Sequence, residues 1–472
     1  MEDTSQDEAP YIVPQAHSNV PEVRAPSPVR SPDIETLGQS AIEEGGGDGN
    51  QDPARPTRST NEPSSIETSN RPRTDDEIKV GSSRPLQKAS ESATQFYTIS
   101  NLIFFAILGT LARLGLQALT FYPGAPVVFS EVWANFGGSL FMGFLSEDRM
   151  LFKEEWGTPT YHQQLEEARL QARNQEESPG SSSPKGAIDL AAAKKTHSAT
   201  KKTIPLYIGL ATGFCGSFTS FSSFMRDVFL ALSNDLRTPL DYPGDYSSEN
   251  AAASTIPRNG GYSFMALLAV IIITVALSMS GLYFGAHLAI FLEPYTPSLP
   301  YSFTRKVLDR AIVVLAWGSW LGAIFLSIWP PDRFRDGPDV WRGRAVFALV
   351  FAPLGCLGRF YVSLHLNRLI PSFPLGTFVV NIFGTAVLGM CWDLQHVPMG
   401  GVVGCQVLQG IQDGFCGCLT TVSTWVSELG SLKRGHAYRY GVVSVMMGLC
   451  FLVVIMGSLR WTQGFAQILC IH

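Results

Sequence analysis

The sequence predicts an all-α membrane protein with nine transmembrane helices, in which one linker helix joins two inverted four-helix repeats. Three observations lead to this fold class: long apolar stretches after residue 98, motifs that occur twice at constant spacing, and one apolar stretch without a counterpart. Apolar residues make up 45% of the 472 residues and charged residues only 16%. Because soluble domains carry about 25% charged residues, this balance favours a membrane protein over a soluble enzyme. The net charge of −5 indicates no nucleic-acid partner.

The N-terminal part of the chain differs from the rest. Residues 1–98 hold no long apolar run and are rich in Ser, Pro and charged residues. Such a segment buries too little apolar surface to offset its chain entropy, so we expect a disordered cytoplasmic tail. It has no basic stretch followed by an apolar core at its start, so we expect no cleavable signal peptide, and the first spanning helix would act as the targeting signal.

Nine apolar stretches are long enough to cross a hydrocarbon core, which takes about 20 helical residues. The expected spans are 99–121, 127–145, 204–230, 262–292, 311–329, 345–366, 375–392, 402–429 and 440–459. Two long polar inserts, 147–203 and 233–261, interrupt the first four spans.

The positions of Lys and Arg predict the orientation. With the N-terminus in the cytoplasm and the C-terminus outside, 25 basic residues fall on the inner side and 7 on the outer side. Basic residues concentrate on the cytoplasmic side of membrane proteins, so this orientation is favoured. Four arginines in the outer loop 330–344 run against it.

An internal repeat organises the spans. Each copy holds Gly-x-x-x-Arg and, 22 residues after the arginine, an asparagine. These residues are Gly109, Arg113 and Asn135 in the first copy and Gly355, Arg359 and Asn381 in the second, at a constant offset of 246. A second motif that begins Gly-Phe-Cys-Gly covers 213–224 and 414–425, at an offset of 201. So many coincidences indicate the duplication of a four-helix unit.

The span 311–329 lies between the two copies and has no counterpart. One extra crossing makes the second copy start on the opposite side of the membrane, so the copies are expected to be inverted about an axis in the membrane plane. The expected division is the tail 1–98, the first unit 99–292, the linker 293–343, the second unit 344–460 and a short C-terminal tail 461–472.

The repeated arginines and asparagines are candidates for an anion path. Arg113 and Arg359 fall inside apolar stretches, where a charge costs at least about 2.5–3.5 kcal/mol at mid-membrane. They could form vestibules that attract anions, or they could snorkel to the interface. Asn135 and Asn381 carry N–H donors that can replace part of the water shell of an anion, or they could hold two helices together.

The third span of each copy is dense in Gly, Ser and Thr across 213–223 and 414–424, so we expect a break there. Unwound backbone in a membrane needs protein or ions to satisfy it, and carbonyls are good ligands for a monovalent cation. Two breaks on the pseudo-axis could hold one cation with four carbonyls, whereas the alternative is a tight interface of small residues. Phe221 and Phe224 could offer their positive ring edges to an anion, although this spacing is more often ordinary helix packing.

With these motifs the sequence resembles the fluoride channels of the CrcB/Fluc family, and in particular the fused two-domain fluoride exporters of fungi and other eukaryotes. The resemblance covers roughly 99–460, with the Gly-x-x-x-Arg stretch, the asparagine and a Gly-x-Thr-Thr-Phe-Ser-Thr-Phe-x-x-Glu-like run in both halves. It implies a plasma-membrane channel in contact with lipid, a monomer that acts as a covalent pseudo-dimer. It also implies passive fluoride efflux without ATP and no enzymatic activity.

The resemblance further implies roles for individual residues. The fluoride path would include Asn135, Asn381, Phe221, Phe224, Val422, Trp425, Ser220 and Thr421. Arg113 and Arg359 would match the family arginine at the vestibules. The carbonyls of Gly216, Thr219, Gly417 and Thr420 would hold a structural sodium ion.

The second half departs from the family pattern, because Val422 and Trp425 stand where the family has two phenylalanines. The two paths are therefore expected to be unequal. One would combine Phe221 with Trp425, and the other would combine Phe224 with Val422. We expect the path with two aromatic rings to conduct.

Other functions fit the same fold class. A proton-coupled anion carrier would need a titratable group at mid-membrane, and Asp413 beside the second break is the candidate. A membrane scaffold would use the tail to bind partners, whereas no motif of a membrane-embedded enzyme occurs. The eight cysteines all lie in or beside apolar stretches, so neither a disulfide framework nor a zinc site is expected.

Overall fold

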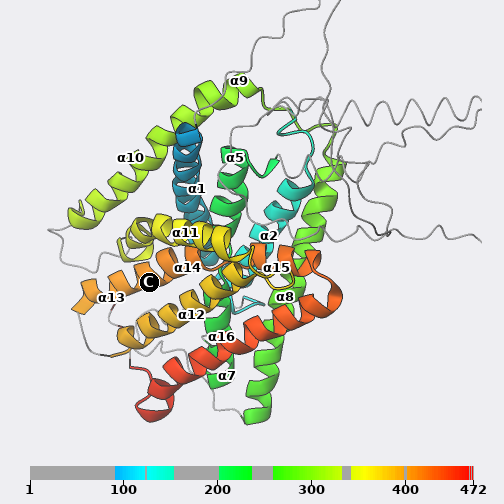
Figure 1. Ribbon diagram of the computed structural model, residues 1–472. Coiled ribbons are helices and arrows are strands. Elements are labelled where there is room, and N and C mark those ends of the chain that lie inside the picture. The colour runs from blue at the N-terminus through cyan, green and yellow to red at the C-terminus, as the bar shows by residue number, and fades with distance from the viewer. Residues whose placement is uncertain are drawn as a thin grey trace, which may run out of the picture. The chain divides into compact units, whose positions relative to one another are not determined.

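The computed structural model describes residues 91–122, 125–153, 201–236, 259–331, 342–397, 401–466, 468 and 470. Within these ranges all regular secondary structure is helical (Figure 1), as the sequence predicts. The expected tail up to residue 90 lies outside the described residues, as do most of the two polar inserts and most of the loop 330–344.

The helices follow the order of the expected units. The first unit contains α1 (Glu91–Thr120), α2 (Glu131–Glu147), α5 (Pro205–Ile208), the π-helical segment η2 (Gly209–Cys215), α6 (Gly216–Phe218), α7 (Phe221–Ser233) and α8 (Gly260–Phe291). The linker contains α9 (Tyr301–Phe303), η3 (Thr304–Leu308) and α10 (Asp309–Ile328). The second unit contains η4 (Arg342–Val346), α11 (Phe347–Leu366), α12 (Leu375–Gln395), α13 (Gly401–Gly410), η5 (Ile411–Cys416), α14 (Gly417–Leu419), α15 (Ser423–Ser431) and α16 (Arg434–Thr462).

Six helical segments of the described residues are long and apolar enough to cross a membrane. They are Ser92–Thr120, Gly260–Phe291, Thr304–Ile328, Phe347–Leu366, Leu375–Gln395 and Arg434–Thr462. Each coincides with one expected span. The other three expected spans are not long single helices: α2 has only 17 residues, and 204–230 and 402–429 are each interrupted by a break. The total of nine therefore stays a prediction.

Helix α1 begins earlier than expected. Its first residue is Glu91, inside the segment that the sequence analysis assigned to the disordered tail. Thr94 and Thr98 are buried, and the Thr98 hydroxyl donates a hydrogen bond of 2.9 Å to the Thr94 carbonyl. Threonine can turn its hydroxyl back onto its own helix in this way, so a polar sequence is buried at little cost. The expectation of disorder is wrong for residues 91–98.

The linker helix α10 contacts the first helix of each unit. The Trp317 indole N–H donates to the Ser100 hydroxyl of α1 over 3.2 Å, and the Trp320 indole N–H donates to the Val350 carbonyl of α11 over 3.0 Å. The linker is therefore packed against both copies of the repeat and is more than a tether.

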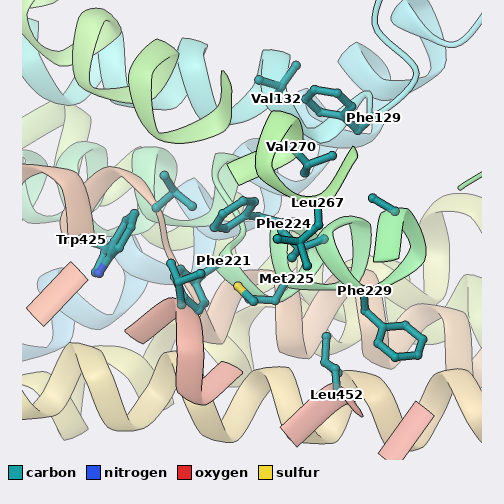
Figure 2. Close-up of a cluster of buried hydrophobic side chains, with 14 of the residues drawn as sticks. Phe129, Val132, Phe221, Phe224, Met225, Phe229, Leu267, Val270, Trp425 and Leu452 are labelled. Carbon is teal, nitrogen blue, oxygen red and sulfur yellow. The ribbon is translucent and has the colours of Figure 1, made fainter. Parts of the chain in front are cut away.

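The largest buried apolar cluster contains residues from both units. It includes Phe221 and Phe224 of α7, Leu267 of α8, Trp425 of α15 and Leu452 of α16 (Figure 2). Because the post-break helices of the two units share this core, the breaks are held against each other by apolar burial as well as by hydrogen bonds.

One disulfide corrects the expectation for the cysteines. Cys405 of α13 is bonded to Cys470, which lies after α16 and 65 residues further along the chain. The other six cysteines form no disulfide. Neither cysteine lies in a recognisable spacing motif, and the pairing of distant cysteines cannot be deduced from sequence alone.

Candidate functional site at the two helix breaks

The third span of each unit breaks where the sequence predicts. In the first unit α6 ends at Phe218, and Thr219 and Ser220 are extended, with ψ of 150° and 118°. In the second unit α14 ends at Leu419, and Thr420 is extended with ψ of 154°. Both breaks follow a π-helical segment, η2 or η5, and α6 packs against α14. The two interrupted backbones therefore meet inside the protein.

The threonine of each break caps the helix of the other unit. The Thr219 hydroxyl oxygen accepts from the backbone N–H groups of Val422 and Ser423, at 3.2 and 3.1 Å. The Thr420 hydroxyl oxygen accepts from the Ser222 N–H at 3.0 Å. The first turn of a helix has N–H groups without intrahelical partners, and a hydroxyl is a good acceptor for them. The hydroxyls in the motif thus have a structural role that the sequence did not reveal.

The serine hydroxyls repeat this exchange. Ser423 Oγ donates to the Cys215 carbonyl at 3.1 Å, and Ser222 Oγ donates to the Cys416 carbonyl at 3.4 Å. Ser423 contacts Cys215, and the equivalent residues Ser222 and Cys416 contact each other in the same way. Reciprocal contacts of this kind indicate a two-fold axis between the two copies. The breaks therefore lie on the pseudo-two-fold axis of the duplicated protein.

The repeated asparagines hold the breaks open. Asn135 Oδ1 accepts from the Ser220 N–H, and Asn381 Oδ1 accepts from the Thr421 N–H, both at 2.9 Å. Both amides are fully buried. The Nδ2 groups differ: Asn381 donates to the Thr421 carbonyl at 3.2 Å, whereas Asn135 Nδ2 has no partner among the described residues. Asn135 therefore keeps both N–H donors for a ligand, whereas Asn381 has used one of its two.

The repeated arginines bind backbone carbonyls of the opposite unit. Arg359 donates to the Thr212 carbonyl at 2.7 Å, and Arg113 donates to the equivalent carbonyl, that of Asp413. Both side chains are only 1% exposed, so neither reaches solvent as a snorkelling side chain would. In each guanidinium Nη1 has no partner among the described residues. Each arginine thus satisfies a carbonyl of a π-helical segment and keeps one donor free, and its place in a vestibule stays a prediction.

Close approach explains the glycines that accompany these motifs. A Cβ on Gly216 would lie 2.4 Å from the Arg359 guanidinium, and a Cβ on Gly417 would lie 2.2 Å from that of Arg113. A Cβ at either position would force the guanidinium to move, so glycine at the start of α6 and α14 leaves each arginine the room to reach its carbonyl.

The aromatic positions are buried beside the breaks. Phe221 packs edge-to-face against Phe224 with 5.7 Å between ring centroids and against Trp425 with 5.4 Å (Figure 2). The expected combination of Phe221 with Trp425 is therefore a direct contact. Val422 is also fully buried in the same cluster. Whether fluoride passes these side chains is a prediction that the geometry alone does not test.

Unpartnered polar atoms concentrate at one of two equivalent helix junctions. Helices α2, α8 and α15 pack against one another. Six of their buried polar atoms have no partner among the described residues: Glu131 Oε1, Asn135 Nδ2, Ser139 Oγ, Ser278 Oγ, Thr424 Oγ1 and Trp425 Nε1. At the junction of α7, α12 and α16 the groups equivalent to Asn135, Ser139 and Thr424 are bonded. These are Asn381, Thr385 and Ser223. Two atoms of α12, Trp392 Nε1 and Asp393 Oδ1, have no partner among the described residues.

The acidic residues after the breaks have different surroundings. The Glu428 carboxylate accepts from the hydroxyls of Thr377 at 2.6 Å and Tyr440 at 2.7 Å. The equivalent Asp227 instead forms an ion pair of 3.1 Å with its neighbour Arg226. The motif predicts an acid at both positions, but the partners of Glu428 come from other helices and carry no sequence signal.

A cation at the axis would need oxygen ligands from the protein. Among the residues that the structure describes, no group of three His, Cys, Asp or Glu side chains could hold a metal ion. The extended ψ angles of Thr219 and Thr420 turn their carbonyls out of the helical hydrogen-bond pattern. A monovalent cation at the axis would therefore have to use backbone carbonyls, which suit the hard oxygen preference of such ions.

A duplicated all-helical membrane protein with two reciprocal helix breaks and buried, unused donors belongs to the class of membrane transport proteins. The chain is a member of the CrcB family: the family model described as "CrcB-like protein, Camphor Resistance (CrcB)" matches residues 101–242 and 346–458, one segment in each half.

Several named relatives are similar to the chain. "Fluoride export protein 1" of Neurospora crassa is 61% identical over 82% of this chain and 70% of its own length. The protein of the same name from Candida albicans is 32% identical over 82% of this chain and 85% of its own length. A bacterial "Fluoride-specific ion channel FluC", from Pseudomonas paraeruginosa, is 33% identical over 26% of this chain and 99% of its own length. None of the solved structures matches the chain.

Proposed function

We propose that this protein is a fluoride-selective channel that exports cytoplasmic fluoride, and that it is not an enzyme. The observation that carries the proposal is the reciprocal pair of asparagine-capped breaks, found in a chain whose relatives are named fluoride exporters and fluoride channels. A membrane potential acts on each charge with about 2.3 kcal/mol per 100 mV. A passive pore therefore lowers internal fluoride without ATP or a coupled ion.

Selectivity for fluoride follows from the size and chemistry of the donors. Fluoride is small and strongly hydrated, so it enters a narrow path only where fixed donors replace its water. Asn135 Nδ2 is buried without a partner, and such a group is stabilised by an acceptor because an unsatisfied buried donor costs about 1–3 kcal/mol. A larger anion such as chloride does not fit a path of this kind.

The conducting path would run along α2, α8 and α15. This junction carries the unpartnered Asn135, Ser139, Ser278 and Thr424, and α15 also carries Trp425, which contacts Phe221. At the equivalent junction the Asn381 amide already donates a hydrogen bond to the Thr421 carbonyl. The asymmetry of the donors thus supports the same path that the two aromatic rings favour.

A structural sodium ion would be held by the carbonyls of Gly216, Thr219, Gly417 and Thr420. The meeting of the breaks and the extended threonines support this assignment. A cation there would be favoured by the negative C-terminal ends of α6 and α14, which meet at the axis.

The protein would act as a monomer in the plasma membrane, surrounded by lipid, with its N-terminus in the cytoplasm and its C-terminus outside. The disulfide supports the last point. In the predicted topology Cys470 and the beginning of α13 are both on the outer side, and disulfides persist in the oxidising compartment outside the cytoplasm.

Growth of fluoride-sensitive cells tests the function. Cells that lack their own exporter should grow on fluoride when they express this protein, and growth should fail with Asn135→Asp. Proteins that only organise partners through a tail would not restore growth, so failure of the wild-type protein at normal membrane abundance would refute the proposal.

A further inference from the structure

The segment that follows α16 is fastened to the second unit at two points. Cys470 forms the disulfide with Cys405 of α13. Phe465 lies beside Trp392 and His396 at the end of α12, with ring centroids 6.1 and 4.7 Å away. Cys470 is buried, and Phe465 packs against the apolar cluster that contains Phe221 and Phe224. We call the described residues 463–466, 468 and 470 the strap.

The strap also contacts the end of α16, which is bonded to the first unit. The Arg460 guanidinium lies 5.9 Å from the centre of the Phe465 ring, and Arg460 Nε donates to Asp235 Oδ2, after the end of α7, at 2.6 Å. The end of α16, the strap and the end of α7 therefore form one connected group.

Arg226 joins this group to the helix that carries the aromatic rings. Arg226 lies on α7, the helix that begins with Phe221. Its guanidinium is 5.8 Å from the centre of the Trp392 ring of α12. Three acidic side chains attract the Arg226 guanidinium electrostatically: Asp227, Asp413 and Glu131. Its equivalent in the second unit is Ser427, so only one end of the duplicated site has this cation.

We propose that the strap is a disulfide-fastened brace that positions Arg226, through Phe465 and Trp392, at the outer end of the fluoride path. A cation is useful there because it attracts the anion as it leaves the aromatic positions. The guanidinium is held by the cation–π contact with Trp392 together with the ion pair to Asp227. Phe465 and the two cysteines are positioning residues in this scheme. The inference rests on the proposed function for its effect on efflux, but the disulfide can be tested without it.

The disulfide is tested by counting thiols in the unfolded full-length protein with a maleimide reagent. Six thiols should react before reduction, matching the six cysteines that form no disulfide, and eight should react after dithiothreitol, matching the total. Dithiothreitol supplies two electrons and two protons to the disulfide and becomes a cyclic disulfide itself. Eight reactive thiols before reduction would overturn the brace.

The positioning role is tested by fluoride efflux from liposomes. Cys470→Ser and Phe465→Ala should each slow efflux about two- to fivefold, the range expected for a lost cation–π contact. Cys450→Ser, which removes an exposed free cysteine of α16, is the matched control and should leave the rate unchanged. Melting temperatures in detergent separate a displaced strap from an unfolded protein.

The decisive comparison uses Arg226→Gln. If the strap acts through Arg226, Phe465→Ala should cause no further loss of efflux in the Arg226→Gln background. A further two- to fivefold loss in that background, or equal rates for Phe465→Ala and Cys450→Ser, would overturn the positioning role. A wild-type protein without any fluoride efflux would instead refute the proposed function and leave the thiol count to judge the strap.

Discussion

At the scale of single residues, equivalent side chains make the same hydrogen bond to the backbone and differ in which of their polar atoms remain without a partner. Asn135 and Asn381 both give Oδ1 to a backbone N–H of the break. Asn381 also uses its Nδ2 group, whereas that of Asn135 is free. The sequence identified both residues, and left open whether they bind an anion or join helices. The structure shows a third use, backbone capping, which no property of an isolated asparagine indicates.

Asn135→Asp separates the two tasks of this residue. The carboxylate keeps an acceptor for the Ser220 N–H but replaces the free donors with a negative oxygen. Like charges placed side by side cost several kcal/mol, so fluoride efflux should fall by at least about tenfold. The matched variant Asn381→Asp should lose less efflux per folded channel, because the donor that it removes serves a carbonyl. Its cost should appear instead as a lower melting temperature, since a buried carboxylate then faces that carbonyl. Similar losses in both would contradict the donor asymmetry.

The aromatic positions provide a second comparison between equivalent sites. Phe221 contacts both Phe224 and Trp425, so Phe221→Ile removes the ring shared by both contacts and should abolish efflux. Phe224→Ile should reduce it less. Both variants remove the same number of ring atoms from a buried cluster, so comparable thermal stabilities with different efflux rates are expected. Comparable efflux losses would refute the assignment of one conducting path.

At the scale of elements, much of the fold could be predicted because lipid allows few alternatives. Apolar length gave the six continuous spans, and the density of Gly, Ser and Thr gave both breaks. The threonine caps could not be predicted, because each connects residues about 200 positions apart across the pseudo-axis. The disulfide and the early start of α1 were missed for a related reason, since both depend on which surfaces meet after folding.

Thr219→Val tests the reciprocal caps. The variant keeps the shape of the side chain but leaves the N–H groups of Val422 and Ser423 without their acceptor. A buried donor without a partner costs about 1–3 kcal/mol, so the unfolding free energy should fall by that amount. Thr219→Ser retains the hydroxyl and should lose less. The measurement is thermal unfolding in detergent, and equal stability of the Val and Ser variants would show that the caps contribute nothing.

At the scale of the whole molecule, the two-fold relation and the single linker helix together define the protein. The reciprocal contacts establish the two-fold relation between the breaks. The inversion in the membrane follows only if the linker crosses once, and this depends on α10, a helix long and apolar enough to span.

Surface labelling tests the inversion. Cysteines introduced at Lys153, in the first unit, and at Lys433, in the second, should both react with an impermeant maleimide only from the cytoplasmic side. A cysteine at Gln463 should react only from outside, since α16 separates it from Lys433. If positions 153 and 433 were accessible from opposite sides, the inverted arrangement would be wrong.

The most direct test of the central claim is fluoride efflux from liposomes that contain the purified protein. Potassium gradients with valinomycin set the membrane potential, and chloride-loaded liposomes are the comparison. We predict fluoride efflux that requires valinomycin, accelerates with potential, is unaffected by a pH gradient and is not accompanied by chloride release. Efflux that proceeds without valinomycin and follows the pH gradient would contradict a passive channel and indicate proton-coupled transport.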